Sequence, residues 1–340
     1  RDGTVTGVQT CALPILAEVN SSHNGDMATA KKMIEEAANC GCDCVKFQSW
    51  SSGSLYSQTY YLENPIAKRF VKKFSLAEEQ LAQLASYCKD LGVAFASTPY
   101  SHKEVDFLVD VCKVPYLKIA SMDLNNYPFL DYIARTGLPI VLSTGMGELQ
   151  EIDRAVETIE QAGNSEICLL HCTSIYPSEP EIINLRTITV LQKRSPHYCI
   201  GFSDHSLGTE IAAAAVAFGA CLIEKHLTLD KTKIGMDNQM AVEPDEMKLL
   251  VSQCHRVYEA MGEEERKVSR LELEQREKMR RSVVYARDIP AGKVLCKGDL
   301  DVKRPGTGVA PEHLEDYVGC VLRRDVAKDT LLRNDDVSCR

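Results

Sequence analysis

The sequence predicts an α/β protein in which a (β/α)8 barrel, or TIM barrel, is followed by a small C-terminal domain. Short apolar, β-branched runs alternate with longer runs of helical periodicity, and the alternation occurs eight times. Eight such units in about 250 residues are typical of a (β/α)8 barrel. A change of composition after Met261 indicates that a separate domain follows. A doubly wound open sheet is the alternative architecture.

The strand candidates are continuously apolar, as expected for parallel strands that helices cover. In order, they are 15–19, 44–48, 93–97, 116–120, 140–143, 167–171, 199–203 and 221–226. The helix candidate 28–40 places Ala30, Met33, Ile34 and Ala37 on one face, and Asp26 is in position to cap it. The other helix candidates are 77–91, 103–112, 149–162 and 209–218.

The C-terminal part of the chain contains an internal repeat. Residues 263–281 are charged and helix-prone but have no full apolar face, so we interpret them as a linker. Beyond them, the segment that starts at Arg287-Asp288-Ile289 is echoed by the one that starts at Arg324-Asp325-Val326. This repeat predicts a domain of two similar halves over 282–340. A domain of about 60 residues is marginally stable alone, so we expect it to dock on the barrel or on a partner subunit.

Composition excludes several classes of protein. The 340-residue chain carries a formal net charge of -9, which disfavours nonspecific binding to nucleic acid or to anionic membranes. No apolar run reaches the roughly 18 to 20 residues of a membrane span, and we expect a cytoplasmic protein. The 14 cysteines are scattered through apolar segments, so we expect reduced thiols. Cys40, Cys42 and Cys44 lack a second Cys/His pair, and we interpret them as structural rather than zinc-binding.

The unusual polar residues lie at the ends of the strand candidates, where barrels of this kind carry their active sites. Lys46 and Lys118 stand between apolar neighbours, and a buried ammonium is unfavourable unless an anion pairs with it. Two such lysines in one lumen, with the hydroxyls and glycines of 143–147, predict a phosphate or carboxylate ligand. The alternative is that each lysine forms a structural ion pair with a neighbour such as Glu18 or Glu224.

Two histidines favour a metal site at the same rim. His205 and His226 end consecutive strand candidates, so in a closed barrel they are neighbours, and Glu18 could complete their ligand shell. Neutral imidazoles with oxygen ligands fit Mn, Fe, Co, Zn or Mg. A lone histidine at a strand end is more often a hydrogen-bonded loop residue, but two beside an acid favour a metal.

A series of short strings, all in one order, resembles the sialic acid synthase (N-acetylneuraminate synthase) family. The strings are Ala17-Glu18-Val19-Asn20, Val45-Lys46-Phe47-Gln48, Leu117-Lys118-Ile119-Ala120-Ser121, Leu142-Ser143-Thr144-Gly145-Met146, Cys172-Thr173-Ser174-Ile175-Tyr176-Pro177, Gly201-Phe202-Ser203-Asp204-His205 and Glu224-Lys225-His226. Val302-Lys303-Arg304-Pro305-Gly306 resembles that family's antifreeze-like (SAF, β-clip) domain, so the resemblance covers the chain from about Leu16 onward. Residues 1–14 match nothing in the family, and we interpret them as a non-native leader.

The resemblance implies a transferase that condenses phosphoenolpyruvate with N-acetylmannosamine, giving N-acetylneuraminic acid and phosphate. By this resemblance, Lys46, Thr98, Lys118, Ser121, Ser143, Ser174 and Ser203 bind phosphoenolpyruvate, and Asp123, Tyr176, Asp237 and Arg304 bind the sugar. His205 and His226 hold Mn or Mg, and Glu18 orients or deprotonates the water that adds to the substrate. The resemblance also implies a domain-swapped homodimer in which Arg304 reaches the partner subunit's barrel.

Two departures from the residues usual in this family leave the identity of the acceptor sugar open. Asp123 stands where sialic acid synthases commonly carry Glu, and Ser174 stands where some carry Asn. A 2,4-diacetamido-trideoxyhexose, the acceptor in legionaminic or pseudaminic acid synthesis, is therefore the alternative substrate. Two other classes compete: a metal-independent Schiff-base aldolase with Lys46 or Lys118 as nucleophile, and a non-catalytic sugar-binding protein. A GxGxxG fingerprint is absent, so we do not predict a dehydrogenase.

Overall fold

The computed structural model describes residues 13–339, which form two compact units that divide between Gly262 and Glu263. Of the predicted leader, residues 1–12 lie outside the described residues, whereas Leu13 is buried in the core of the first unit.

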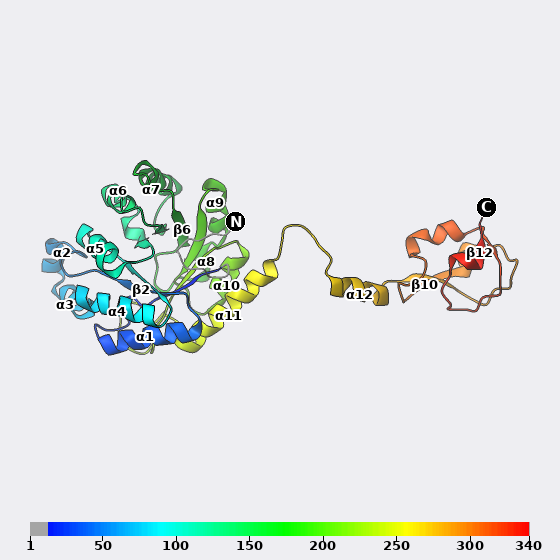
Figure 1. The fold of residues 1–340 in the computed structure, drawn as a ribbon, viewed down its shortest axis with the longest axis horizontal. Coiled ribbons are helices and arrows are strands. Elements are labelled where there is room, and N and C mark those ends of the chain that lie inside the picture. The colour runs from blue at the N-terminus through cyan, green and yellow to red at the C-terminus, as the bar shows by residue number, and fades with distance from the viewer. Residues whose placement is uncertain (1–12, 340) are drawn as a thin grey trace. The chain divides into compact units, whose positions relative to one another are not determined.

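The first unit is the predicted barrel of eight parallel strands with helices on its outer side (Figure 1). Its strands are β1 (Ile15–Glu18), β2 (Cys44–Gln48), β3 (Ala94–Thr98), β4 (Leu117–Ile119), β5 (Ile140–Ser143), β6 (Ile167–Cys172), β7 (Cys199–Asp204) and β8 (Ile223–His226). The first strand pairs with both β2 and β8, with Glu18 opposite Lys46 on one side and His226 on the other. Since the strands follow chain order around the sheet and β3 contacts β4 at the seam, the doubly wound alternative is wrong.

The helices include several that the sequence does not predict. They are α1 (Met27–Cys40), α2 (Gln58–Glu63), α3 (Pro65–Phe74), α4 (Glu78–Asp90), α5 (His102–Phe107), α6 (Tyr127–Ala134), α7 (Leu149–Gln161), α8 (Pro180–Ile183), α9 (Arg186–Arg194), α10 (Glu210–Ala217) and α11 (Pro244–Met261). The predicted helix 103–112 continues beyond α5 as a π-helical turn, Leu108–Cys112. Among the described residues, no helix is both long and apolar enough to cross a membrane.

The first helix begins and ends as its residues dictate. The Asp26 carboxylate accepts a hydrogen bond of 2.7 Å from the Thr29 N–H, so the predicted N-cap is confirmed. The helix ends at Gly41, whose φ of 85° is a left-handed conformation that glycine adopts without strain. Ala30, Met33 and Ala37 are buried between this helix and the strands.

Alternation along the strands separates two apolar layers. Residues such as Val45, Phe47 and Ile119 point outward and form the large core under the helices. Leu16, Cys44, Tyr116, Val141, Cys168, Leu170 and Leu222 point inward and form a second cluster, which we call the lumen floor. The next inward positions towards the C-terminal ends of the strands carry the polar residues Glu18, Lys46, Lys118 and Glu224. The predicted site therefore stands on an apolar floor.

The second unit contains α12 (Arg270–Met279), which has no buried residue, and the strands β9 (Ser282–Tyr285), β10 (Leu300–Lys303), β11 (Val321–Leu322) and β12 (Val337–Ser338). Strand β9 pairs antiparallel with β10, and β11 pairs antiparallel with β12. The sequence repeat is visible as two equivalent ion pairs. Arg287 bonds to Asp299 at 2.8 Å in one half, and Arg324 bonds to Asp336 at 2.7 Å in the other.

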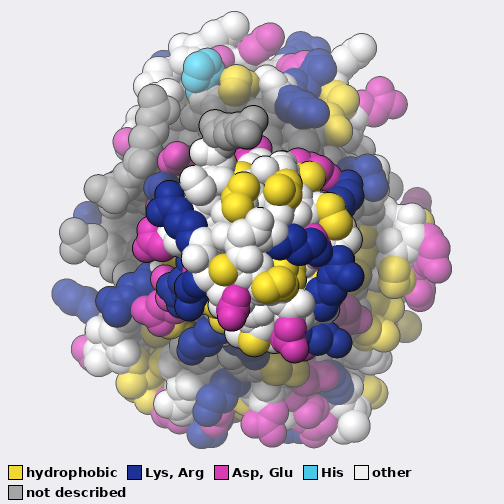
Figure 2. All heavy atoms as spheres, turned by 90° about the vertical axis from the view of Figure 1, so that its right-hand side faces the viewer, with side chains coloured by type: hydrophobic (Ala, Val, Ile, Leu, Met, Phe, Trp, Pro, Cys, Tyr) yellow, Lys and Arg dark blue, Asp and Glu magenta, His cyan; other side chains and the backbone are white. Residues whose placement is uncertain are grey.

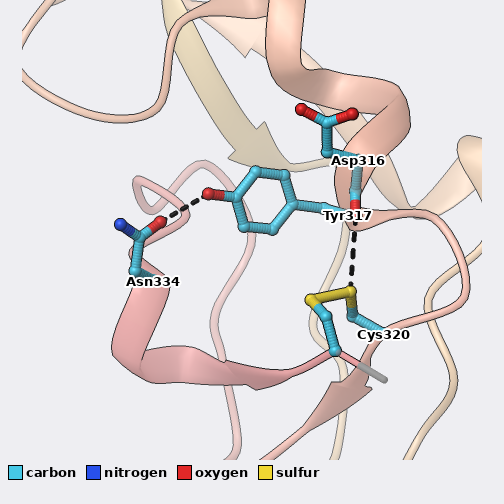
Figure 3. Close-up of a disulfide and its surroundings, with 5 residues drawn as sticks. Asp316, Tyr317, Cys320 and Asn334 are labelled. Atoms are coloured by element: carbon cyan, nitrogen blue, oxygen red, sulfur yellow. Dashed lines mark hydrogen bonds between the residues drawn. A yellow bond between two sulfur atoms is a disulfide. The ribbon is translucent and has the colours of Figure 1, made fainter.

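A disulfide between Cys320 and Cys339 lies in this unit (Figure 3). The prediction of reduced thiols is wrong for these two residues. Pairing of β11 with β12 places Val321 opposite Ser338, so the cysteines that flank this pair approach to 4.4 Å between Cα atoms, which is within disulfide range. One face of the unit carries hydrophobic side chains bordered by Lys and Arg side chains (Figure 2).

Candidate active site

A cavity of about 280 Å³ opens at the C-terminal ends of the barrel strands. Most of the residues predicted for the site line it: Glu18, Lys46, Thr98, Lys118, Ser121, Ser143, Ser174, Tyr176, Ser203, His205, His226 and Asp237. Asp123 is not among the lining residues, and its carboxylate accepts a hydrogen bond of 2.9 Å from Asn126. Arg304 belongs to the second unit.

Lys46 lies between two carboxylates. Its Nζ contacts Glu18 Oε2 and lies 3.6 Å from Glu224 Oε2, and all three side chains are at most 5% exposed. Its ammonium also lies 3.4 Å from Thr98 Oγ1. Because this lysine has the carboxylate partners that the structural alternative requires, its charge is compensated within the protein.

Lys118 differs in this respect. Its Nζ donates to Ser143 Oγ at 2.6 Å and to the Ile119 carbonyl oxygen at 3.1 Å, and no carboxylate of the described residues forms an ion pair with it. Burial lowers the pKa of this 2%-exposed side chain, against the attraction of Glu224. A buried ammonium that opens on a cavity and forms no ion pair with a described carboxylate is suited to bind an anion.

The two carboxylates near Lys46 differ in pKa. Burial raises the pKa of Glu18 to about 7, although Lys46 opposes the shift. Burial acts in the same direction on Glu224, but Lys118, Lys46 and the 2.8 Å hydrogen bond from Ser203 outweigh it and lower its pKa to about 2. Glu224 is therefore ionised at neutral pH, and Glu18 is the carboxyl that can gain or lose a proton there.

Short polar side chains surround Gly145, next to Ser143. A Cβ atom at Gly145 would lie 2.2 Å from Ser174 Oγ and 2.8 Å from both Cys172 Sγ and Ser121 Oγ, so only glycine fits. The Gly145 N–H donates to Ser121 Oγ, and the Thr144 N–H donates to the Leu170 carbonyl oxygen, each at 3.0 Å. These two N–H groups are therefore bonded within the protein, and the hydroxyls of Ser121 and Ser143 are available to a ligand.

His205 and His226 lie side by side at the rim, with ring centroids 5.4 Å apart. His205 Nδ1 is 2.7 Å from the Thr173 carbonyl oxygen, which can only accept, so Nδ1 carries the proton and Nε2 keeps its lone pair. His226 Nδ1 is buried without a hydrogen-bond partner among the described residues. Burial lowers the pKa of both rings, so both are neutral at pH 7.

These two imidazoles fit a divalent metal ion, because neutral rings with free lone pairs are metal ligands. Within residues 13–339, no third His, Cys, Asp or Glu completes a three-residue site with them. Glu18 is held by Lys46, so the sequence-based idea that it completes the shell has no support here. Any further ligands are water or substrate oxygens. Asp237 lies beside the pair, 3.9 Å from His226 Nδ1, and accepts a hydrogen bond from Asn20.

Several residues that line the cavity have no role assigned from the sequence. They include Gln48, which ends a strand candidate, and Trp50, Tyr56, Tyr100 and Met236. Trp50 and Tyr56 lie in the segment between β2 and α4, where the sequence predicts neither helix nor strand. Their apolar and aromatic character, close after a strand end, is the signal that could have found them.

The fold and the site define the chain as a (β/α)8-barrel protein with a polar lumen and a C-terminal SAF domain, which matches residues 280–338. The NeuB family matches residues 33–266, and the chain belongs to this family. It is 37% identical over 331 residues to N,N'-diacetyllegionaminic acid synthase of Legionella pneumophila, covering 94% of this chain and 92% of that protein.

Two further relatives broaden the comparison. The chain is 35% identical over 315 residues to the human N-acetylneuraminate-9-phosphate synthase, covering 90% of this chain and 87% of that protein. A solved structure of N-acetylneuraminic acid synthetase from Leptospira borgpetersenii superposes with a TM-score of 0.71 at 34% identity, covering 77% of this chain and 89% of that chain. The relatives are synthases of acidic sugars, and their names differ in the sugar acid they make.

Proposed function

We propose that this protein condenses phosphoenolpyruvate with the open-chain form of an N-acetylated amino sugar, giving a nine-carbon 3-deoxy-2-ulosonic acid and phosphate. The observation that carries the proposal is Lys118, a buried ammonium with no carboxylate partner among the described residues, in a cavity that also holds two neutral imidazoles. The names of the relatives support the same reaction class.

In the proposed reaction, C3 of the enol forms a bond to the aldehyde carbon of the sugar. Water adds at C2, and the C2 to oxygen bond of the phosphate ester then breaks to leave a ketone. The water supplies two protons, of which one ends on the new hydroxyl group and the other on phosphate. Lys118, with the hydroxyls of Ser143 and Ser121, holds the anionic groups of phosphoenolpyruvate. Lys46, Thr98 and Ser174 complete this end of the cavity.

Glu18 is the proposed group that orients and deprotonates the water. Its pKa of about 7 suits a general base at neutral pH. Ser203 acts indirectly, because its hydroxyl donates a hydrogen bond to Glu224 and keeps that carboxylate ionised. His205 and His226 are the proposed ligands of Mn or Mg, which would polarise the aldehyde of the sugar when bound.

N-acetylmannosamine is the proposed acceptor, with product N-acetylneuraminic acid, and a 2,4-diacetamido-trideoxyhexose is the second candidate. The diacetamido alternative is favoured by the identity to the legionaminic acid synthase and by the apolar lining residues Met122, Met146 and Met236. Tyr176 and Asp237 line the proposed sugar end of the cavity. The contacts of Asp123 and Arg304 with the sugar, the homodimer and the cytoplasmic location stay predictions.

The test is phosphate release from phosphoenolpyruvate with Mn²⁺, using N-acetylmannosamine and the diacetamido sugars at equal concentration. We expect release only when both substrates are present, and its loss with EDTA. Borohydride trapping of pyruvate on Lys46 or Lys118, with activity that survives EDTA, would instead assign a Schiff-base aldolase. No release with any acceptor would overturn the proposed function and favour a non-catalytic sugar-binding protein.

A further inference from the structure

Asn20 lines the cavity just after β1 and has an unusual backbone conformation. Its φ of 33° lies in the left-handed region, where asparagine and glycine occur more readily than other residues. Its backbone N–H donates to Glu18 Oε1 at 2.7 Å. Lys46 contacts the other oxygen, Oε2, so both oxygens of the Glu18 carboxyl group have a partner. The proposed base is therefore held in one orientation.

The side chain of Asn20 reaches a second carboxylate of the cavity. Its Nδ2 donates to Asp237 Oδ2, the same oxygen that lies 3.9 Å from His226 Nδ1. Since an ionised carboxylate can only accept, the amide must turn its NH2 group towards Asp237. Asn20 is 6% exposed, and its Oδ1 is buried without a hydrogen-bond partner among the described residues. An unbonded buried oxygen is unfavourable, so the amide is oriented by Asp237 and not by a partner of its oxygen.

Asp237 lies on the connection between β8 and α11, and Asn20 joins this connection to the first strand of the barrel. Pairing of Leu227 with Val242 closes the connection at its base. Asn238, which is 1% exposed, forms its side-chain hydrogen bonds to other residues of the same connection. Those contacts hold the connection to itself, whereas the bond from Asn20 spans 217 positions of the sequence. One residue thus links two carboxylates that come from distant parts of the chain.

We propose that Asn20 is a positioning residue that sets the separation of the Glu18 and Asp237 carboxyl groups. The inference rests on the proposed function, in which Glu18 deprotonates the water and Asp237 borders the sugar end of the cavity. A misplacement of about 1 Å among such groups can cost about 100-fold in rate. The anionic groups of phosphoenolpyruvate are held by Lys118, whose hydrogen bonds do not involve Asn20. Loss of the link should therefore slow the reaction with the sugar without weakening the binding of phosphoenolpyruvate.

The first test is Asn20→Gly, because glycine adopts the same φ and keeps the N–H that bonds to Glu18 but lacks the amide. We expect kcat/KM for the sugar to fall about 10- to 100-fold, the range for a hydrogen bond to a charged group. Binding of phosphoenolpyruvate is measured separately by the fluorescence of Trp50, the single tryptophan of the chain, which lines the cavity. The Kd for phosphoenolpyruvate should stay within about twofold of that of the unmutated protein.

Asn24→Gly is a matched control from the same loop. Asn24 also has a positive φ, of 54°, and a buried Oδ1 without a partner among the described residues, but it is not among the residues that line the cavity. The two substitutions therefore remove the same side chain and add similar backbone freedom. We expect Asn24→Gly to leave both kcat/KM for the sugar and the Kd for phosphoenolpyruvate unchanged.

An exchange of the two side chains tests the bond between Asn20 and Asp237 directly. Asn20→Asp alone places two carboxylates in contact, so we expect kcat/KM for the sugar to fall at least about 100-fold at pH 8. In the Asp237→Asn background, the same substitution restores the hydrogen bond with donor and acceptor exchanged, so its further cost should be less than about threefold. Comparison within that background cancels any direct role of the Asp237 carboxylate.

Equal losses from Asn20→Asp in both backgrounds would overturn the inference, as would an effect of Asn24→Gly as large as that of Asn20→Gly. A rise in the Kd for phosphoenolpyruvate that matches the loss of kcat/KM in Asn20→Gly would also overturn it, because the effect would then be a general distortion of the barrel. Unchanged kinetics in Asn20→Gly would contradict the inference alone. An unmutated protein that releases no phosphate with any acceptor would overturn the proposed function and the inference with it.

Discussion

Two buried lysines on neighbouring faces of the same barrel have opposite surroundings. Lys225, on the outer side of β8, is fully buried and donates to Asp204 Oδ2 and to the Ser206 carbonyl oxygen, both at 2.7 Å. Lys118, on the inner side of β4, is almost as buried but has only a hydroxyl and a carbonyl oxygen as partners among the described residues. The first lysine contacts a carboxylate directly, whereas the second is attracted by Glu224 without forming an ion pair.

This difference shows why burial alone does not identify a functional lysine. Both positions remove an ammonium from water, which is unfavourable in either place. Asp204 offsets that cost at Lys225 and is itself fixed by hydrogen bonds from the Ser206 N–H and hydroxyl. At Lys118, Glu224 attracts the ammonium without forming an ion pair, so an anion from outside the chain can make the direct contact. The groups that contact a buried lysine, and not how deeply it is buried, therefore show whether it is structural or binds a ligand.

Of the substitutions that test this comparison of the two lysines, Lys118→Ala has the largest expected effect, and that effect is on activity. Lys118→Ala should abolish phosphate release, a loss of at least about 1000-fold, because it removes the only lumen cation without a carboxylate partner among the described residues. The urea midpoint should fall only slightly, because buried Glu224 loses the attraction of Lys118 but keeps Lys46 and the hydrogen bond from Ser203. Steady-state kinetics and urea unfolding check both parts, and activity like that of the unmutated protein would contradict the assigned site. His226→Ala is expected to abolish release as well.

The counterpart is Lys225→Met, which should act on stability. Removing this ammonium leaves Asp204 buried without its partner, and breaking such a pair typically costs about 3–5 kcal/mol. We expect the midpoint of urea unfolding to fall accordingly while kcat of the folded fraction stays close to that of the unmutated protein. A normal midpoint with lost activity would reverse the roles assigned to the two lysines.

A third prediction concerns Glu18 and pH. Its folded-state pKa of about 7 exceeds its ordinary value of 4.5, so between these values the folded protein binds more protons than the unfolded chain. Stability contributed at this site therefore falls as pH rises from about 4.5 to 7 and is constant above that range. A glutamine does not titrate, so the stability of Glu18→Gln should not fall over this pH range. The variant should therefore become more stable relative to the unmutated protein as pH rises. Urea titrations at pH 5 and pH 8 measure the difference, and parallel curves would exclude the raised pKa.

The smallest expected effect is that of Ser143→Ala. The hydroxyl accepts from Lys118 and has a proton available for the ligand, so its loss should raise the KM for phosphoenolpyruvate about 3- to 10-fold with a smaller change in kcat. Thr136→Ala, which removes a hydroxyl bonded to the Ile133 carbonyl oxygen at the end of α6, is a control that should not change this KM. An equal effect of both substitutions would show that Ser143 has no specific role.

The barrel could be predicted from the sequence because parallel strands buried on both faces leave a strong apolar signal. Val45 and Phe47 flank Lys46, and Leu117 and Ile119 flank Lys118, so the alternation alone is enough to place both lysines in the lumen. The bounds of 44–48 and 140–143 are as predicted, and those of the other strands differ by one or two residues, since hydrogen-bond geometry and not composition decides where each ladder ends.

The partners of the site residues could not be predicted, because they depend on contacts that the sequence pattern does not encode. Which lysine has a carboxylate partner is decided by side chains from β1 and β8, two paired strands that are far apart in sequence. The hydrogen bond from Gly145 to Ser121 joins two separate loops, and the turn Ser121–Asp123 decides that Ser121 faces the cavity while Asp123 bonds to Asn126. The sequence could nominate these residues but could not assign their partners.

The lumen floor sets the order in which ligands can come and go. Leu16, Tyr116 and Leu170 pack beneath the lysines, so substrates enter and products leave through the mouth of the barrel. On the proposed function, phosphoenolpyruvate occupies the deeper position at 2%-exposed Lys118, and the sugar sits above it beside Tyr176, which is 50% exposed. A sugar bound first would block the deeper position, which makes phosphoenolpyruvate the leading substrate of a sequential kinetic mechanism. Phosphate should accordingly inhibit in competition with phosphoenolpyruvate rather than with the sugar.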